Sequence, residues 1–162
     1  MSYVQRQVKI FEAIDNTGGT SVPAGVGNRN VMPYDLEIRK DDFFAHSTTV
    51  NPGEVEILVD GWYKIGAAIT TICTDLSGGA RGSLTLRFEV DAGSGFTLQP
   101  DSARNYQRED ADPIGTTICC SGVFQFSAGD KVRIVYYDSV TSAPPNYETD
   151  QYGSRLLVEF IE

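Results

Sequence analysis

The alternation over residues 83–90 is the cleanest pattern in the sequence, and it limits the folds open to the chain. Apolar side chains stand at Leu84, Leu86, Phe88 and Val90, and polar ones stand between them. This period of two is typical of a strand that buries one face. No stretch shows the i, i+3, i+4, i+7 apolar spacing of an amphipathic helix. The chain is therefore predicted to be all-β.

Further extended segments recur along the chain with turn signals between them. They are predicted over 3–11, 31–38, 43–50, 52–59, 62–72, 96–98, 114–126, 131–138 and 155–161. Polar loops are expected at 15–30, 99–113 and 139–153. Asp60-Gly61 predicts a tight hairpin turn between the segments 52–59 and 62–72. This spacing favours a two-sheet antiparallel sandwich of about 8–10 strands.

Composition and charge narrow the class of protein. The 162 residues are 41% hydrophobic and suit one globular domain. The net charge of -9, with no basic patch, disfavours nucleic acid as a partner. No apolar run approaches the roughly 20 residues that span a bilayer, and residues 1–14 resemble no secretory leader, so no membrane partner is expected. The odd set Cys73, Cys119 and Cys120 predicts free thiols buried in strands, in a reducing cytoplasm.

No catalytic or metal-binding constellation stands out. His46 precedes Ser47, but neighbours in a strand point to opposite faces, so His46 is expected to be a satisfied or surface histidine. A single histidine without Cys-x-x-Cys argues against zinc. Acidic side chains that could bind calcium are Glu109, Asp110, Asp112, Asp138, Glu148 and Asp150. They lack the D-x-D-x-D-G spacing, and solvated acidic loops are the usual explanation. No enzyme activity, cofactor or metal is predicted.

Three short motifs, in order, resemble a known family. They are D-G-W-Y-K-I at 60–65, with Gly61 and Tyr63; V-F-Q-F-S-A-G-D-K-V at 123–132, with Gly129 and Asp130; and S-R-L-L-V-E-F at 154–160. Over residues 50–162 the chain is similar to the jelly rolls of the globular head of the first complement component and of tumour necrosis factor. The resemblance implies a two-sheet jelly roll over 31–162 that assembles as a homotrimer. Residues 1–30 would add an N-terminal strand and a polar, Gly-rich arm.

The sequence looks most like the stand-alone heads of this kind in phage particles. That resemblance implies a non-enzymatic virion structural protein, made in the host cytoplasm and placed on the capsid surface. Such a trimeric decoration or cement protein would bind the major capsid protein and stabilise the shell. The alternative is a receptor- or glycan-binding head of a phage tail or head fibre.

Aromatic residues are the candidates for contacts. Trp62, Tyr136, Tyr137 and Phe160 are expected in the core or in the trimer interface. Because adjacent residues in a strand face opposite ways, one of each adjacent pair is expected in the core. The polar loops carry Tyr106, Tyr147 and Tyr152, which would contact the ligand of a fibre head.

Overall fold

A computed structural model describes residues 8–23, 25–73, 81–108, 115–139 and 147–162. The described residues form twelve strands and one short 3-10 turn, η1 (Val26–Asn28). The strands are β1 (Ile10–Ile14), β2 (Asn30–Val31), β3 (Leu36–Lys40), β4 (Phe44–His46), β5 (Glu54–Ile57), β6 (Gly61–Cys73), β7 (Arg81–Asp91), β8 (Thr97–Arg108), β9 (Gly115–Phe126), β10 (Lys131–Asp138), β11 (Tyr147–Thr149) and β12 (Arg155–Phe160).

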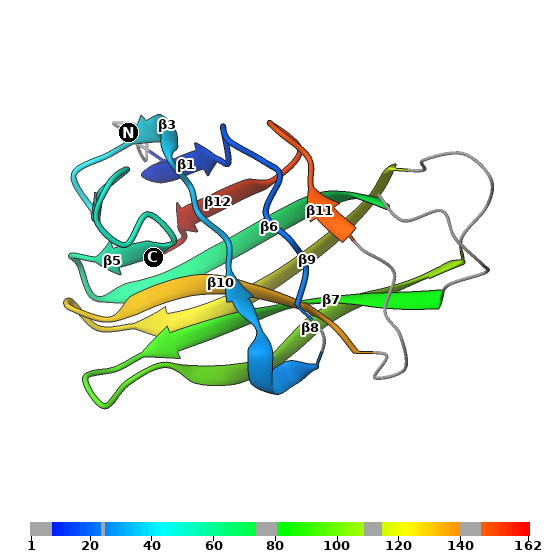
Figure 1. Cartoon of the computed structure of the whole chain (residues 1–162). Coiled ribbons are helices and arrows are strands. Elements are labelled where there is room, and N and C mark those ends of the chain that lie inside the picture. Colours follow the sequence, from blue (N-terminus) through cyan, green and yellow to red (C-terminus); the bar gives the residue numbers. More distant parts are fainter. Residues whose placement is uncertain (1–7, 24, 74–80, 109–114, 140–146) are drawn as a thin grey trace, which may run out of the picture.

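The strands form two antiparallel sheets of six, and the long strands run together along the molecule (Figure 1). In sheet A, β6 lies between β9 on one side and β12 and β11 on the other, and β12 is followed by β1 and β3. In sheet B the order is β4-β5-β10-β7-β8, with β2 also paired to β10. The prediction of an all-β, two-sheet jelly-roll sandwich is confirmed.

The core lies between the sheets, and Tyr63 is at its aromatic centre. Its ring centroid is 5.9 Å from that of Phe44, 5.8 Å from Phe126 and 5.2 Å from Phe160. Because Phe44 belongs to sheet B and the other residues to sheet A, this cluster joins the two sheets. The Tyr63 hydroxyl donates a hydrogen bond to the Val59 carbonyl at 2.6 Å. Burial, together with the nearby Asp60, raises the pKa of Tyr63 to about 12.

Two local predictions were wrong. The expected Asp60-Gly61 hairpin does not form, because β5 pairs with β4 and β10 in sheet B while β6 belongs to sheet A. The chain at Asp60 therefore crosses from one sheet to the other. Residues 99–108 of the predicted polar loop 99–113 belong instead to strand β8, which pairs with β7. This segment is polar and poor in strand-forming residues, but its pairing with β7 makes it a strand.

The N-terminal stretch is part of the sandwich from β1 onward. Strand β1 lies between β12 and β3, and Phe11 and Ala13 are fully buried. The following segment bridges Ser21 to Glu148 of β11 in sheet A, and then continues to β2, which pairs with β10 in sheet B. This segment therefore runs from one sheet to the other and packs against both (Figure 1). Residues 1–7 lie outside the described residues.

Residue 61 must be a glycine because the C-terminal residues of the chain lie close against its backbone. A Cβ atom there would lie 2.5 Å from the Glu162 carbonyl oxygen and 2.5 Å from Cε2 of Phe160. We expect Gly61→Ala to destabilise the protein by about 1–3 kcal/mol, because backbone and a core ring must both shift. Urea unfolding measures the effect. The control is Gly115→Ala, at the start of β9, where the nearest atom to a new Cβ is 3.9 Å away; an equal loss in both variants would contradict the prediction.

Candidate functional site

The outer faces of the two sheets differ in how the chain itself covers them. In sheet B, β10 is buried on both sides: Val135 and Tyr137 face outward yet are 0% and 7% exposed. On the neighbouring β7, Thr85 and Glu89 were predicted to face solvent but are also buried. The reason is that η1 and the residues around it pack against β10. The middle of the outer face of sheet B, along β10 and β7, is therefore closed, whereas Ser102, Arg104 and Tyr106 of β8 stay exposed at its edge.

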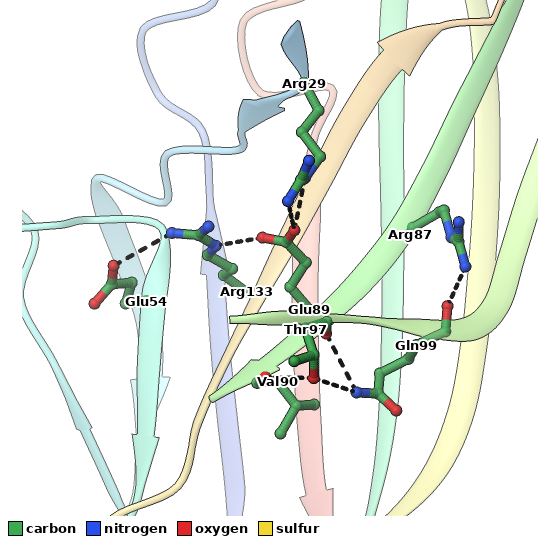
Figure 2. Close-up of polar contacts among 8 residues, drawn as sticks. All are labelled: Arg29, Glu54, Arg87, Glu89, Val90, Thr97, Gln99 and Arg133. Carbon is green, nitrogen blue, oxygen red and sulfur yellow. Dashed lines mark hydrogen bonds and ion pairs between the residues drawn. The ribbon is translucent and has the colours of Figure 1, made fainter. Parts of the chain in front are cut away.

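A buried carboxylate anchors this cover (Figure 2). The Glu89 side chain on β7 is fully buried, and its Oε1 accepts a hydrogen bond from Arg29 Nε at 2.6 Å. Its Oε2 accepts a hydrogen bond from Arg133 Nε of β10 at 2.7 Å. A buried carboxylate is tolerated only when it is paired and hydrogen-bonded in this way. Glu89 thus connects the chain next to η1 with two strands of sheet B.

Arg133 extends the network along the outer face of sheet B. Its Nη1 lies 3.7 Å from Oε1 of Glu54 on β5, and its guanidinium carbon lies 3.7 Å from the centroid of the Phe96 ring. Figure 2 also shows Arg87 of β7, whose Nη2 donates to the Gln99 carbonyl of β8 at 2.6 Å. Charged side chains therefore bind their own neighbours here, which leaves this face poorly suited to a large apolar contact.

No described segment of the chain covers the outer face of sheet A, and apolar side chains gather there. Four large ones belong to four different strands: Leu36 (39% exposed), Trp62 (42%), Val123 (55%) and Leu157 (36%). The strand register places the outward-facing residues of sheet A in rows that cross the sheet. The rows are Leu36, Ile14, Arg155, Ala68 and Cys119; then Arg39, Glu12, Leu157, Gly66 and Ser121; then Ile10, Glu159, Lys64 and Val123.

The middle of the outer face of sheet A is shallow because its side chains are small. Gly66, Ala68, Cys119 and Ser121 line an open hollow of about 340 Å³, together with Arg155 and Leu157. Trp62 stands on the same face, near the start of β6. Such a face, flat and apolar with one large aromatic side chain, is typical of protein–protein contacts.

Charges on the outer face of sheet A are balanced. Lys64 stands opposite Glu159 in the strand register, and Arg155 forms an ion pair with Glu12. The chain as a whole carries a net charge of -9. Like copies repel one another through such a charge unless the contact surface is locally neutral. This face meets that requirement.

The structure separates the aromatic residues that the sequence grouped. Trp62 lies on the outer face of sheet A, and Phe160 packs on Tyr63 and Phe43 in the core. Tyr136 and Tyr137 are both buried, although adjacent residues of a strand point to opposite faces. Tyr137 is buried because the outer face of sheet B is covered along β10, which sequence alternation does not show.

The Gly129–Asp130 motif forms the turn between β9 and β10. Gly129 has φ +95°, a conformation that glycine adopts most easily. Its N–H donates to the Ile57 carbonyl, the Ile57 N–H donates to the Asp130 carbonyl, and the Asp130 carboxylate accepts from the Ser127 N–H. The motif therefore fixes this turn against the end of β5.

The three tyrosines expected in ligand loops do not share one loop surface. Tyr106 belongs to strand β8 of sheet B and is 56% exposed, so its expected loop position was wrong. Tyr147 begins β11, where its backbone pairs with Cys73 in sheet A. Tyr152 is exposed in the turn before β12, with φ 62°.

The described part of the chain contains no assembled catalytic or metal-binding site. His46 is buried and contacts Glu37 and Pro52, whereas Ser47 Oγ accepts a hydrogen bond from the Val50 N–H. The described residues contain no group of three His, Cys, Asp or Glu side chains placed to hold a metal ion. Glu109, Asp110 and Asp112 lie outside the described residues. Cys119 is a free thiol, but it is exposed and so was wrongly predicted as buried.

The strand order and sheet pairing define an antiparallel jelly-roll sandwich. Solved structures of murine APRIL are similar in fold. Those at pH 8.0 and pH 5.0 match with a TM-score of 0.62 at 9% and 10% identity, and that at pH 8.5 with a TM-score of 0.61 at 9% identity. Each match covers 96% of this chain and 100% of the other. No protein-family model and no curated protein matches the sequence.

One further observation concerns membranes. The part of the chain that the structure describes holds no helix with the length and apolar character needed to cross a membrane.

The Glu89 network makes a stability prediction. We expect Glu89→Gln to cost about 2–3 kcal/mol, because two arginines lose their shared counter-charge; wholly buried pairs cost more, about 3–5 kcal/mol. We expect the smaller cost because the side chains of Arg29 and Arg133 are 31% and 21% exposed. The control is Asp42→Asn, because the Asp42 side chain in its pair with Lys9 is 75% exposed. Its expected change in unfolding free energy is within about 0.5 kcal/mol, and a similar loss in both variants would refute the role of burial.

Proposed function

We propose that this protein is a non-enzymatic structural protein that self-associates as a homotrimer through the outer face of sheet A and decorates a viral capsid. The observation that carries the self-association is the contrast between the two outer faces. The chain covers sheet B with its own segment and a buried ion network. It leaves sheet A with exposed apolar side chains on four strands.

The size and chemistry of the outer face of sheet A suit a second copy of this chain. A standard interface takes about 800 Å² from each partner, which is roughly a tenth of the 8517 Å² surface of one chain. Its balanced charges remove the repulsion that a net charge of -9 would otherwise create. The number of copies, three, is supported by the resemblance of the motifs at 60–65, 123–132 and 154–160 to trimeric jelly rolls.

The capsid role rests on the resemblance to stand-alone heads in phage particles. In this role the trimer performs no chemistry: it sits at a threefold position and clamps neighbouring copies of the major capsid protein. Burial of a few hundred Å² of apolar surface at about 25 cal/mol per Å², repeated over many sites, would stabilise the shell. Of the stretch 1–30, residues 1–7 are the proposed arm, because Lys9 and the residues from β1 onward belong to the sandwich.

Self-association is tested by the native mass in solution. We expect three times 17.7 kDa, about 53 kDa, by size exclusion with light scattering. Val123→Glu adds a charge to the outer face of sheet A and should give a folded monomer, since each copy in the trimer would bury that charge. Val50→Glu is the matched control, in a loop at 70% exposure, and should keep the trimer. A wild-type monomer at all concentrations, or a trimeric Val123→Glu, would refute assembly through this face.

Decoration is tested with particles of the virus that encodes the chain. The purified protein should co-sediment with shells that lack it, and these shells should withstand higher temperature once it is added. Loss of binding after deletion of residues 1–7, with the trimer intact, would assign the contact to the arm. If shells do not bind the protein but a glycan panel does, the fibre-head alternative replaces this proposal.

A further inference from the structure

The outer face of sheet B changes its charge from one end of the strands to the other. The strand register places the outward-facing residues of this sheet in rows that cross β5, β10, β7 and β8. The rows are Glu56, Lys131 and Asp91; then Glu54, Arg133 and Glu89; then Val135, Arg87 and Ser102; then Tyr137, Thr85 and Arg104; then Ser83 and Tyr106. The first two rows alternate acidic and basic side chains. The other three rows hold two arginines and no carboxylate.

The two arginines of the acid-free rows, Arg87 and Arg104, have neutral partners only. Arg87 Nη2 donates to the Gln99 carbonyl at 2.6 Å, as Figure 2 shows, and Arg104 Nε lies 3.4 Å from Thr85 Oγ1. Neither guanidinium forms an ion pair within the part of the chain that the structure describes. Two positive charges therefore stand without a counter-ion among these residues.

The position of Arg87 makes the missing counter-ion costly. Its Nε is buried and has no hydrogen-bond partner among the described residues. A charged group out of contact with water is costly unless it is paired. Arg87 and Arg104 are also diagonal neighbours across β7 and β8, a position in which Cβ atoms lie about 7–8 Å apart and long side chains can meet. Their like charges repel each other, and an anion bound between them would relieve both costs.

The described carboxylates that flank the acid-free rows are bound to other groups. Glu89 accepts hydrogen bonds from Arg29 and Arg133. Asp138, at the end of β10, is buried, and its Oδ1 accepts a hydrogen bond from the Ser83 N–H at 3.0 Å. Each carboxylate already serves another donor, so neither neutralises the two arginines of the acid-free rows.

The acid-free rows are open to solvent on their β8 side. Ser102, Arg104 and Tyr106 are exposed, and Arg87 is half-buried beside them. These four residues, named here the β8 strip, present two guanidinium groups, a hydroxyl and an aromatic ring. The planar guanidinium matches a carboxylate, because its N–H groups can donate to both carboxylate oxygens. The tyrosine ring offers an apolar surface next to this anion site.

We infer that the β8 strip binds a carboxylate side chain of a partner protein, with an apolar neighbour of that carboxylate against the Tyr106 ring. The carboxylate supplies the counter-charge that Arg87 and Arg104 lack. A protein segment with one or two carboxylates suits this chain better than a long polyanion does, because the net charge of -9 repels nucleic acids and sulfated glycans. The β8 strip belongs to sheet B, so the inference does not depend on self-association through sheet A.

An NMR titration with a short acidic peptide tests the site. The probe is the acetylated, amidated peptide Ser-Glu-Tyr-Glu-Tyr-Ser, added to the folded protein at low salt, where exposed charges are little screened. We expect saturable shifts of the backbone amides of residues 102–106, with a Kd of about 1 mM or tighter. The same peptide with Gln in place of Glu should bind about tenfold more weakly, because its hydrogen bonds carry no charge. Equal binding of the two peptides, or no saturable shifts, would overturn the inference.

A pair of variants locates the binding on the β8 strip. Arg104→Gln and Lys131→Gln each remove one positive charge from an exposed side chain on the outer face of sheet B, but Lys131 belongs to a row that holds carboxylates. Arg104→Gln should weaken the acidic peptide about tenfold, and Lys131→Gln by less than about twofold. An equal loss in both variants would refute the site, because overall charge would explain it. Shifts at residues 102–106 with a heparin oligosaccharide but not with the peptide would refute a protein partner.

Discussion

The packing of one aromatic cluster between two sheets is the interaction on which the rest of the structure depends. Tyr63 of sheet A contacts Phe44 of sheet B as well as Phe126 and Phe160 of its own sheet. This cluster sets the distance between the sheets. The closing strand β12 holds β1 and β6 on its two sides, so the start, the middle and the end of the chain belong to one sheet. The core is thus built by contacts between residues far apart in sequence.

The same sandwich has two outer faces, and the chain treats them differently. On sheet B, Glu89 binds Arg29 and Arg133, and the segment around η1 buries Tyr137. A carboxylate buried in this way holds its partners in one arrangement, because any other leaves a charge unpaired. On sheet A no such network exists among the described residues, and apolar side chains are exposed. The difference between the faces carries the proposal of self-association.

Much of the fold could be predicted from local pattern. Alternation located β7, β10 and β12 correctly, and the motif around Gly129 gave the turn that separates β9 from β10. The candidate surface was predicted only in part: Trp62 was a candidate for a contact, but the small side chains beside Leu157 gave no signal. These small side chains line one hollow only because β6, β9 and β12 are neighbours in sheet A.

The sequence by itself determined the class of structure, because a period of two in apolar residues can bury one face only as a strand. It also determined which side chains of β7 enter the core between the sheets, namely Leu84, Leu86 and Phe88. Only the tertiary structure decided the rest. Asp60-Gly61 became a crossing between sheets, since β5 found its partners elsewhere, and Tyr137 was buried by a segment over a hundred residues earlier in the chain. His46 acquired both polar contacts from other segments. Covering and pairing depend on neighbours in space, and alternation along one strand carries no information about them.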